Sequence, residues 1–179
     1  MSSRSRANPV LVLLLAAAPL LAGAADPASS SSADALSSTA IEQQLKSAGF
    51  PQPAGRGLHR MPDTSCAVTL NIAFEYNSSR LKPQASAQLQ QLELALVSDA
   101  LREYRFLVAG HTDAKGNAQS NQRLSTQRAE AVKGFLTAHG VDAARLDAVG
   151  YGSERLLVPD QPDDPRNRRV QICKLGAAR

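Results

Sequence analysis

Four segments of the chain have the apolar pattern of β-strands. They are residues 66–76, 104–110, 145–152 and 168–175. In the first segment every second residue is large and apolar, which predicts a strand with one buried face. These alternating residues are Val68, Leu70, Ile72 and Phe74. The second segment, YRFLVAG, is apolar nearly throughout, and this pattern predicts a strand in the middle of a sheet.

Three other segments repeat apolar residues at intervals of three or four, the spacing of an amphipathic helix. They are residues 35–48, 84–101 and 118–139. The repeat of the middle segment consists of Leu89, Leu92, Leu94, Ala95 and Leu96. Gly49 follows the first helix as a stop, and Gly140 follows the last one in the position where a left-handed cap is favoured.

The order of these elements predicts the fold class. After the short helix at about residues 35–48, the chain runs strand, helix, strand, helix, strand, loop, strand. Each crossover from a strand through a helix to the next strand returns on the same side of the sheet. We therefore expect an α/β two-layer sandwich, βαβαββ, in which a four-stranded mixed sheet carries two helices on one face. The loop at residues 153–167 contains three prolines, which exclude regular structure there.

Residues 1–24 have the pattern of a signal peptide for export. Two arginines precede an apolar run at residues 10–21, and small residues at 22–24 supply a cleavage site. The run is shorter than the ~20 apolar residues of a membrane span, so an uncleaved membrane anchor is the weaker interpretation. No cysteine follows the small residues, and we therefore expect no lipid anchor.

Composition divides the rest of the chain into a linker, a domain and a tail. Residues 25–65 are rich in Ser, Pro and Gly around the short predicted helix, which is typical of a linker. We expect one domain at residues 66–175 and a tail at 176–179.

Charge and cysteine content remove several classes of function. Loss of the signal peptide removes two arginines and no acid, so the formal net charge falls from +4 to +2. No block of Lys and Arg is interleaved with aromatic residues, and we expect no binding of nucleic acid. The His and Cys residues have no metal-ligand spacing, so we expect neither a metal site nor a cofactor.

One arginine stands on the apolar stripe of the last predicted helix. The residues of this stripe are Asn121, Leu124, Arg128, Val132 and Phe135. Burial of an unpaired guanidinium would cost several kcal/mol, so Arg128 needs an acidic partner. Asp113 is the strongest candidate, because it follows a predicted central strand, at the carboxyl end where α/β sheets present binding groups.

Two interpretations of this pair remain open from the residues alone. Arg128 and Asp113 could form a structural salt bridge that fastens the loop before the helix. Alternatively, they could form a split pocket, in which Arg128 donates to a carboxylate and Asp113 accepts from an ammonium group of the same ligand. Such a pocket fits the zwitterionic end of an amino acid.

Four segments, in this order and spacing, resemble the signature of the OmpA C-terminal-like family, which includes peptidoglycan-associated lipoproteins and flagellar stator proteins. The segments are FEYNSSRLKP, GHTDAKGNAQSNQRLSTQRAEAV, AVGYGSERLL and NRRVQI. The resemblance covers about residues 66 to 175. This chain departs from many relatives in lacking a lipid-anchor cysteine.

The resemblance implies a function in the cell envelope. Domains of this family bind the stem peptide of peptidoglycan non-covalently, and an aspartate and an arginine hold the amino-acid end of meso-diaminopimelate. Those residues match Asp113 and Arg128. The other candidate binding residues that it implies are Thr112, Asn121, Arg168 and Arg169. We therefore expect a periplasmic, peptidoglycan-binding protein of a Gram-negative envelope, associated with the outer membrane, that contributes to envelope integrity.

Two other functions compete with this expectation. An enzyme would use His111 and Asp113 as base and orienter and Ser125 as nucleophile, but the sequence contains no nucleophile elbow or metal motif. We expect no enzymatic activity. The other rival is an envelope interaction module with a degenerate pocket, in which residues 35 to 60 bind other envelope proteins.

Cys66 and Cys173 are candidates for a disulfide, because thiols of exported proteins usually pair. In the sheet of the family, the first and last strands are antiparallel neighbours, which brings the two cysteines close together. Cys66 is in phase with Val68, whereas Cys173 is out of phase with Ile172, so perfect alternation would place the thiols on opposite faces. A bulge at a strand end would remove this conflict.

Overall fold

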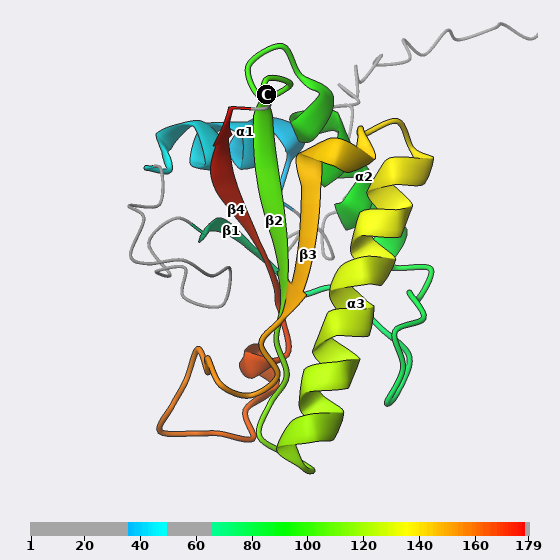
Figure 1. Ribbon diagram of the computed structural model, residues 1–179, viewed down its shortest axis with the longest axis vertical. Helices are drawn as coiled ribbons and strands as arrows, with labels where there is room; N and C mark the ends of the chain where they lie inside the picture. The colour runs from blue at the N-terminus through cyan, green and yellow to red at the C-terminus, as the bar shows by residue number, and fades with distance from the viewer. Residues whose placement is uncertain (1–35, 50–65, 178–179) are drawn as a thin grey trace, which may run out of the picture. The chain divides into compact units, whose positions relative to one another are not determined.

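The computed structural model describes residues 36–49 and 66–177 of the chain. The predicted signal peptide and most of the predicted linker lie outside these described residues. Figure 1 shows a twisted sheet with helices packed against it. No helix in the described part of the chain is long and apolar enough to cross a membrane.

The sheet has four strands in the order β1-β4-β2-β3. Their bounds are β1 Cys66–Leu70, β2 Tyr104–Gly110, β3 Leu146–Gly150 and β4 Val170–Ala177. Strands β2 and β3 are parallel, and β4 runs antiparallel to both β2 and β1. The predicted mixed sheet is confirmed, with YRFLVAG as one of its two inner strands.

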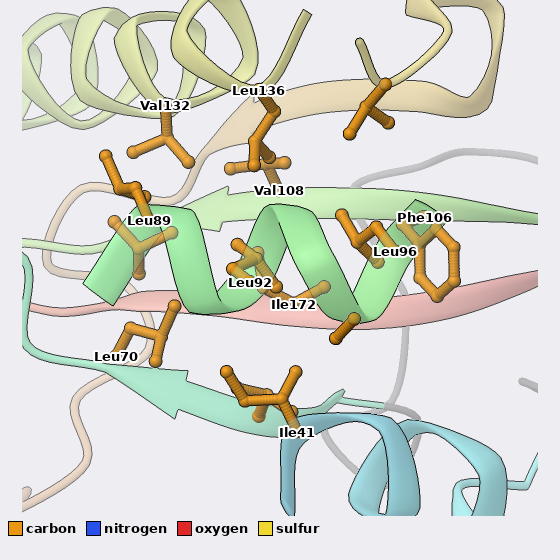
Figure 2. Packing of buried hydrophobic residues seen from close by; sticks show 14 of the residues in the cluster. Ile41, Leu70, Leu89, Leu92, Leu96, Phe106, Val108, Val132, Leu136 and Ile172 are labelled. Atoms are coloured by element: carbon orange, nitrogen blue, oxygen red, sulfur yellow. The ribbon is translucent and has the colours of Figure 1, made fainter. Parts of the chain in front are cut away.

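Three helices share one hydrophobic core with one face of the sheet. Their bounds are α1 Ser38–Ser47, α2 Ala85–Val97 and α3 Ala118–Ala138. In Figure 2 side chains from all three helices meet those of the inner strands; the labelled examples are Ile41, Leu92, Leu136, Val108 and Ile172. The α/β sandwich class is therefore confirmed, with a third helix added to the two that we expected on this face.

Helix α1 belongs to the packed structure, although we expected it in a linker. Its Ile41 and Leu45 are fully buried. At its start the Ser38 N–H donates to the side chain of Gln91 in α2 at 2.9 Å. At its end the Lys174 ammonium donates to the carbonyl of Lys46 at 3.3 Å, which places a cation at the negative end of the helix.

Several boundaries differ from the sequence predictions. Strand β1 ends at Leu70 rather than at residue 76, because Asn71 is exposed and no ladder partner continues beyond Val170. Leu94 lies on the outer side of α2 and is half exposed. The proline-rich loop contains a 3₁₀ helix at Pro165–Asn167, contrary to expectation, because a proline is compatible with the first turn of a helix.

Candidate binding site

A cavity of about 220 Å³ lies near the start of β4. It is bordered by the segment that follows β1, by α3 and by the ends of β2 and the proline-rich loop. The lining residues are Asn71, Ile72, Ala73, Phe74, Lys82, His111, Arg128, Arg168 and Arg169. Four of these side chains are cationic, so the cavity suits an anionic group.

Arg128 is a largely buried cation of this cavity, with 9% of its surface exposed. Its Nε donates to the carbonyl of Ser78 at 3.0 Å, and its guanidinium lies 4.9 Å from the ring centroid of Phe74. Neither terminal nitrogen has a hydrogen-bond partner among the described residues. Burial lowers the pKa of Arg128, the charge of Arg168 lowers it further, and Asp113 opposes both effects. An anion in the cavity would therefore stabilise the charged side chain.

Asp113 forms its ion pair with Arg168, which corrects the direct Arg128–Asp113 pair offered from the sequence. Arg168 Nη1 donates to Asp113 Oδ2 at 2.7 Å. No ion pair within 4.0 Å joins Arg128 to a carboxylate in the described part of the chain. The arrangement follows from the sheet: β4 lies beside β2, and the His111 N–H donates to the carbonyl of Arg169, so the next residues of the two segments also meet.

Asn121 and Thr112 form hydrogen bonds within and around the loop that carries Asp113. The Asn121 amide donates to the carbonyls of Asp113 at 3.2 Å and Lys115 at 2.9 Å. The Thr112 N–H donates to the carbonyl of Gly152 at 2.8 Å. Both side chains are buried, and neither borders the cavity. The Asn121 amide thus holds the backbone of the loop that carries Asp113. Contact of Thr112 or Asn121 with the ligand, which the resemblance implies, stays a prediction.

Arg169 borders the cavity but is held by the protein. Its terminal nitrogens donate to the carbonyls of Asn167 at 3.3 Å and Arg155 at 3.1 Å, and to Gln171 Oε1 at 3.1 Å. Arg169 is 6% exposed, so it contributes positive charge to the cavity but little accessible surface. Arg168 is the more accessible cation, with 45% of its side chain exposed.

The cavity is also lined by Phe74, Lys82 and His111, which no sequence pattern assigned to the binding set. His111 is buried, and its ring stacks on that of Tyr151 with centroids 5.4 Å apart. Burial and the charges of Arg169 and Arg155 lower the pKa of His111 to about 3, against smaller opposing effects of Gln171 and the Arg155 backbone. The imidazole is therefore neutral near pH 7. The sequence places His111 at the end of the second predicted strand, in the segment GHTD, but gives no indication that its side chain is buried.

Ser125, the nucleophile of the rejected enzyme hypothesis, fastens α3 to the sheet. It is fully buried, its hydroxyl donates to the carbonyl of Gln122 at 2.9 Å, and it accepts from the N–H of Gly152 at 2.8 Å. Helix α3 approaches β2 so closely that a Cβ at Gly110 would collide with the backbone carbonyl of Ser125. This contact sets the position from which α3 presents Arg128.

The chain belongs to the OmpA family, whose family model matches residues 73–169. It is 38% identical over 103 residues to a peptidoglycan-associated lipoprotein of Pseudomonas aeruginosa, a match that covers 56% of this chain and 60% of the relative. It is 32% identical over 113 residues to outer membrane protein A of Buchnera aphidicola, with coverage of 63% and 33%. The chain thus spans less than two thirds of the length of these relatives.

Solved structures agree with this assignment. The peptidoglycan-associated lipoprotein of Burkholderia pseudomallei aligns with a TM-score of 0.50 and 31% identity over 57% of this chain and 87% of that structure. The periplasmic domain of Helicobacter pylori MotB has a TM-score of 0.51 and 24% identity, with coverage of 62% and 75%, and shares the fold. The relatives are proteins of the cell envelope and support a periplasmic location for this chain.

Proposed function

We propose that this domain binds peptidoglycan non-covalently through the amino-acid end of meso-diaminopimelate in the stem peptide. The observation that carries the proposal is the buried Arg128 guanidinium, which borders a cavity and has no carboxylate partner among the described residues. The similarity to peptidoglycan-associated lipoproteins supports peptidoglycan as the ligand.

Each charged group of the site has a distinct role in this proposal. Arg128 offers its two terminal nitrogens to the ligand carboxylate, a planar fork that matches carboxylate geometry. Arg168 adds a second cation at the same cavity. Asp113 accepts a hydrogen bond from the ligand ammonium, which competes with Arg168 for this carboxylate. The ring of Phe74 packs on Arg128 and orients it.

Binding to the cell wall would let the protein contribute to envelope integrity and remain associated with peptidoglycan near the outer membrane. The cavity argues against a degenerate pocket, because Arg128 is buried beside it and forms no ion pair with a carboxylate among the described residues. The rival interaction module, which predicts such a degenerate pocket, is therefore the less well supported function.

Co-sedimentation with purified sacculi tests the proposal. Arg128→Ala and Asp113→Ala should each cost about 2–5 kcal/mol of binding free energy, the usual effect of removing one member of a desolvated charge pair. Arg123→Ala is a matched control, because Arg123 lies on α3 but is exposed and does not border the cavity. Wild-type sedimentation by a double variant that remains folded by circular dichroism would contradict the proposal.

A further inference from the structure

Strand β1 is at the edge of the sheet and pairs only with β4 among the described strands. The carbonyl of Arg169 accepts from the N–H of His111 at 3.0 Å, so the main chain of Arg169 faces β2. Hydrogen-bonding direction alternates along a strand, so Val170 faces β1 and its partner Leu70 faces β4. Thr69 and Asn71, on either side of Leu70, therefore direct their N–H and C=O groups to the open edge.

This open edge leads into the candidate site. Thr69 and Asn71 are exposed, and no backbone hydrogen bond of Asn71 is formed with another described residue. The two residues border a surface groove whose other lining residues are Gln88, Leu157, Arg166 and Arg169. Asn71 and Arg169 also line the cavity that contains Arg128, so the groove and the cavity share a wall.

We propose that the edge of β1 at Thr69 and Asn71 binds the main chain of the stem peptide by strand addition. The extended peptide exchanges main-chain hydrogen bonds with alternate residues of the edge, while its charged end enters the cavity beside Arg128. This inference rests on the proposed function and adds a second recognition element to it. Recognition of the amide groups would be independent of the peptide side chains.

The chemistry and length of the edge favour a short peptide over the strand of a partner protein. Toward Cys66, the surface beside Ala67 is bordered by α1; the α1 residues there are Gln43, Gln44 and Ser47. The edge is thus flanked by α1 at Ala67, and the groove that adjoins the cavity lies at Thr69 and Asn71. Thr69 and Asn71 carry uncharged hydrogen-bonding groups in this groove, which suit neutral amides.

Calorimetric titration with a synthetic stem peptide that ends in meso-diaminopimelate tests this inference. N-methylation of each peptide amide in turn removes one donor and leaves the charged end unchanged. Methylation of the amide that pairs with the edge should weaken binding about 5–10-fold, the effect of one lost hydrogen bond. In the complex, amide exchange at Thr69 or Asn71 should be slower than in the free protein. Unchanged affinity for every methylated peptide would overturn the inference.

Two protein variants distinguish the contribution of the Asn71 main chain to peptide binding from that of its side chain. Asn71→Ala removes only the side chain, whereas Asn71→Pro also removes the N–H of the edge and should weaken binding about 5–10-fold more than Asn71→Ala does. Equal losses in both would overturn strand addition. If Asn71→Pro does not fold, the methylated peptides decide. Failure of the proposed function is distinguishable, because binding of the unmethylated peptide would then be absent or insensitive to Arg128→Ala.

Discussion

Arg168, which lines the same cavity as Arg128, is joined by an ion pair of 2.7 Å to Asp113, which is not itself among the lining residues. Asp113 is thus neutralised by the protein, whereas Arg128 is not. A ligand carboxylate would meet Arg128 directly, but a ligand ammonium must compete with Arg168 for Asp113. The carboxylate and the ammonium of a zwitterionic ligand therefore contribute differently to the binding free energy, because only the ammonium has to displace a partner.

Replacement of Asp113 should distinguish the contribution of the ligand ammonium from that of the ligand carboxylate. In Asp113→Ala the affinity for a diaminopimelate peptide should fall, because its ammonium loses the only acceptor proposed for it. The affinity for an analogue without this ammonium should stay equal or rise, since Arg168 is released to the carboxylate. Titration calorimetry with both peptides measures the difference. Parallel losses for the two ligands would show that Asp113 acts only through the structure of the site.

Replacement of diaminopimelate by lysine in the peptide should weaken binding steeply. Lysine lacks the carboxylate that Arg128 is proposed to hold, and the buried guanidinium would remain without its partner. Direct titration of the two peptides into the wild-type protein and Arg128→Ala provides the check. Selectivity should vanish in the variant. Equal affinity of the wild type for both peptides would leave Arg128 with a structural role.

Hydrophobic patterning located the strands and helices, because the helices and β1 have one buried and one exposed face and β2 is apolar nearly throughout. It could not show which strands are neighbours. The insertion of β4 between β1 and β2 brings Arg168 to Asp113, and this partner differs from the one expected from spacing along the chain. Phe74 continues the alternation of the first predicted strand, and Lys82 lies in the turn that follows, so the hydrophobic pattern gave no indication that either borders the cavity.

Gly110 should be intolerant of a side chain. A Cβ there would collide with the carbonyl of Ser125, a backbone atom of α3 that cannot move alone. Gly110→Ala should therefore destabilise the domain by about 1–3 kcal/mol. Gly134→Ala is the matched control: no atom lies within 4 Å of the added Cβ, and this helical position should gain about 0.5–1 kcal/mol. Urea denaturation measures both, and equal stability of the two variants would contradict the close contact.

His111 should make the fold sensitive to acid. Its pKa is about 3 in the folded protein, against an ordinary value of 6.5, because burial and two arginines disfavour the charged imidazole. Between these values the unfolded chain binds a proton that the folded protein excludes. Stability from this residue is therefore present above pH 6.5 and is lost as the pH falls toward 3, with a slope of up to ~1.4 kcal/mol per pH unit.

Urea denaturation at several pH values compares the wild type with His111→Phe. The variant keeps an aromatic ring beside Tyr151 but cannot titrate. Acidic groups elsewhere affect both proteins alike, so the difference between their stabilities isolates His111. This difference should change with pH in the window below 6.5. A constant difference across the window would contradict the suppressed pKa.

The disulfide between Cys66 and Cys173 should contribute measurably to stability. The structure joins the two residues, and a register shift between Cys66 and Val68 removes the conflict of strand phase noted in the sequence. The bond spans a sequence separation of 107 residues. Closure of so long a loop restricts the unfolded chain, and we expect its loss to cost about 2–4 kcal/mol.

Thiol titration and denaturation under reducing conditions test this bond. The unreduced, unfolded protein should contain no free thiol, and a reductant should lower the urea midpoint. A double variant, Cys66→Ala with Cys173→Ala, should be destabilised in the same direction and should not respond to the reductant. Alanine suits position 173 because Cys173 is fully buried beside Leu107. Two free thiols per chain in the unreduced protein would rule out the bond, whatever the stability of the variant.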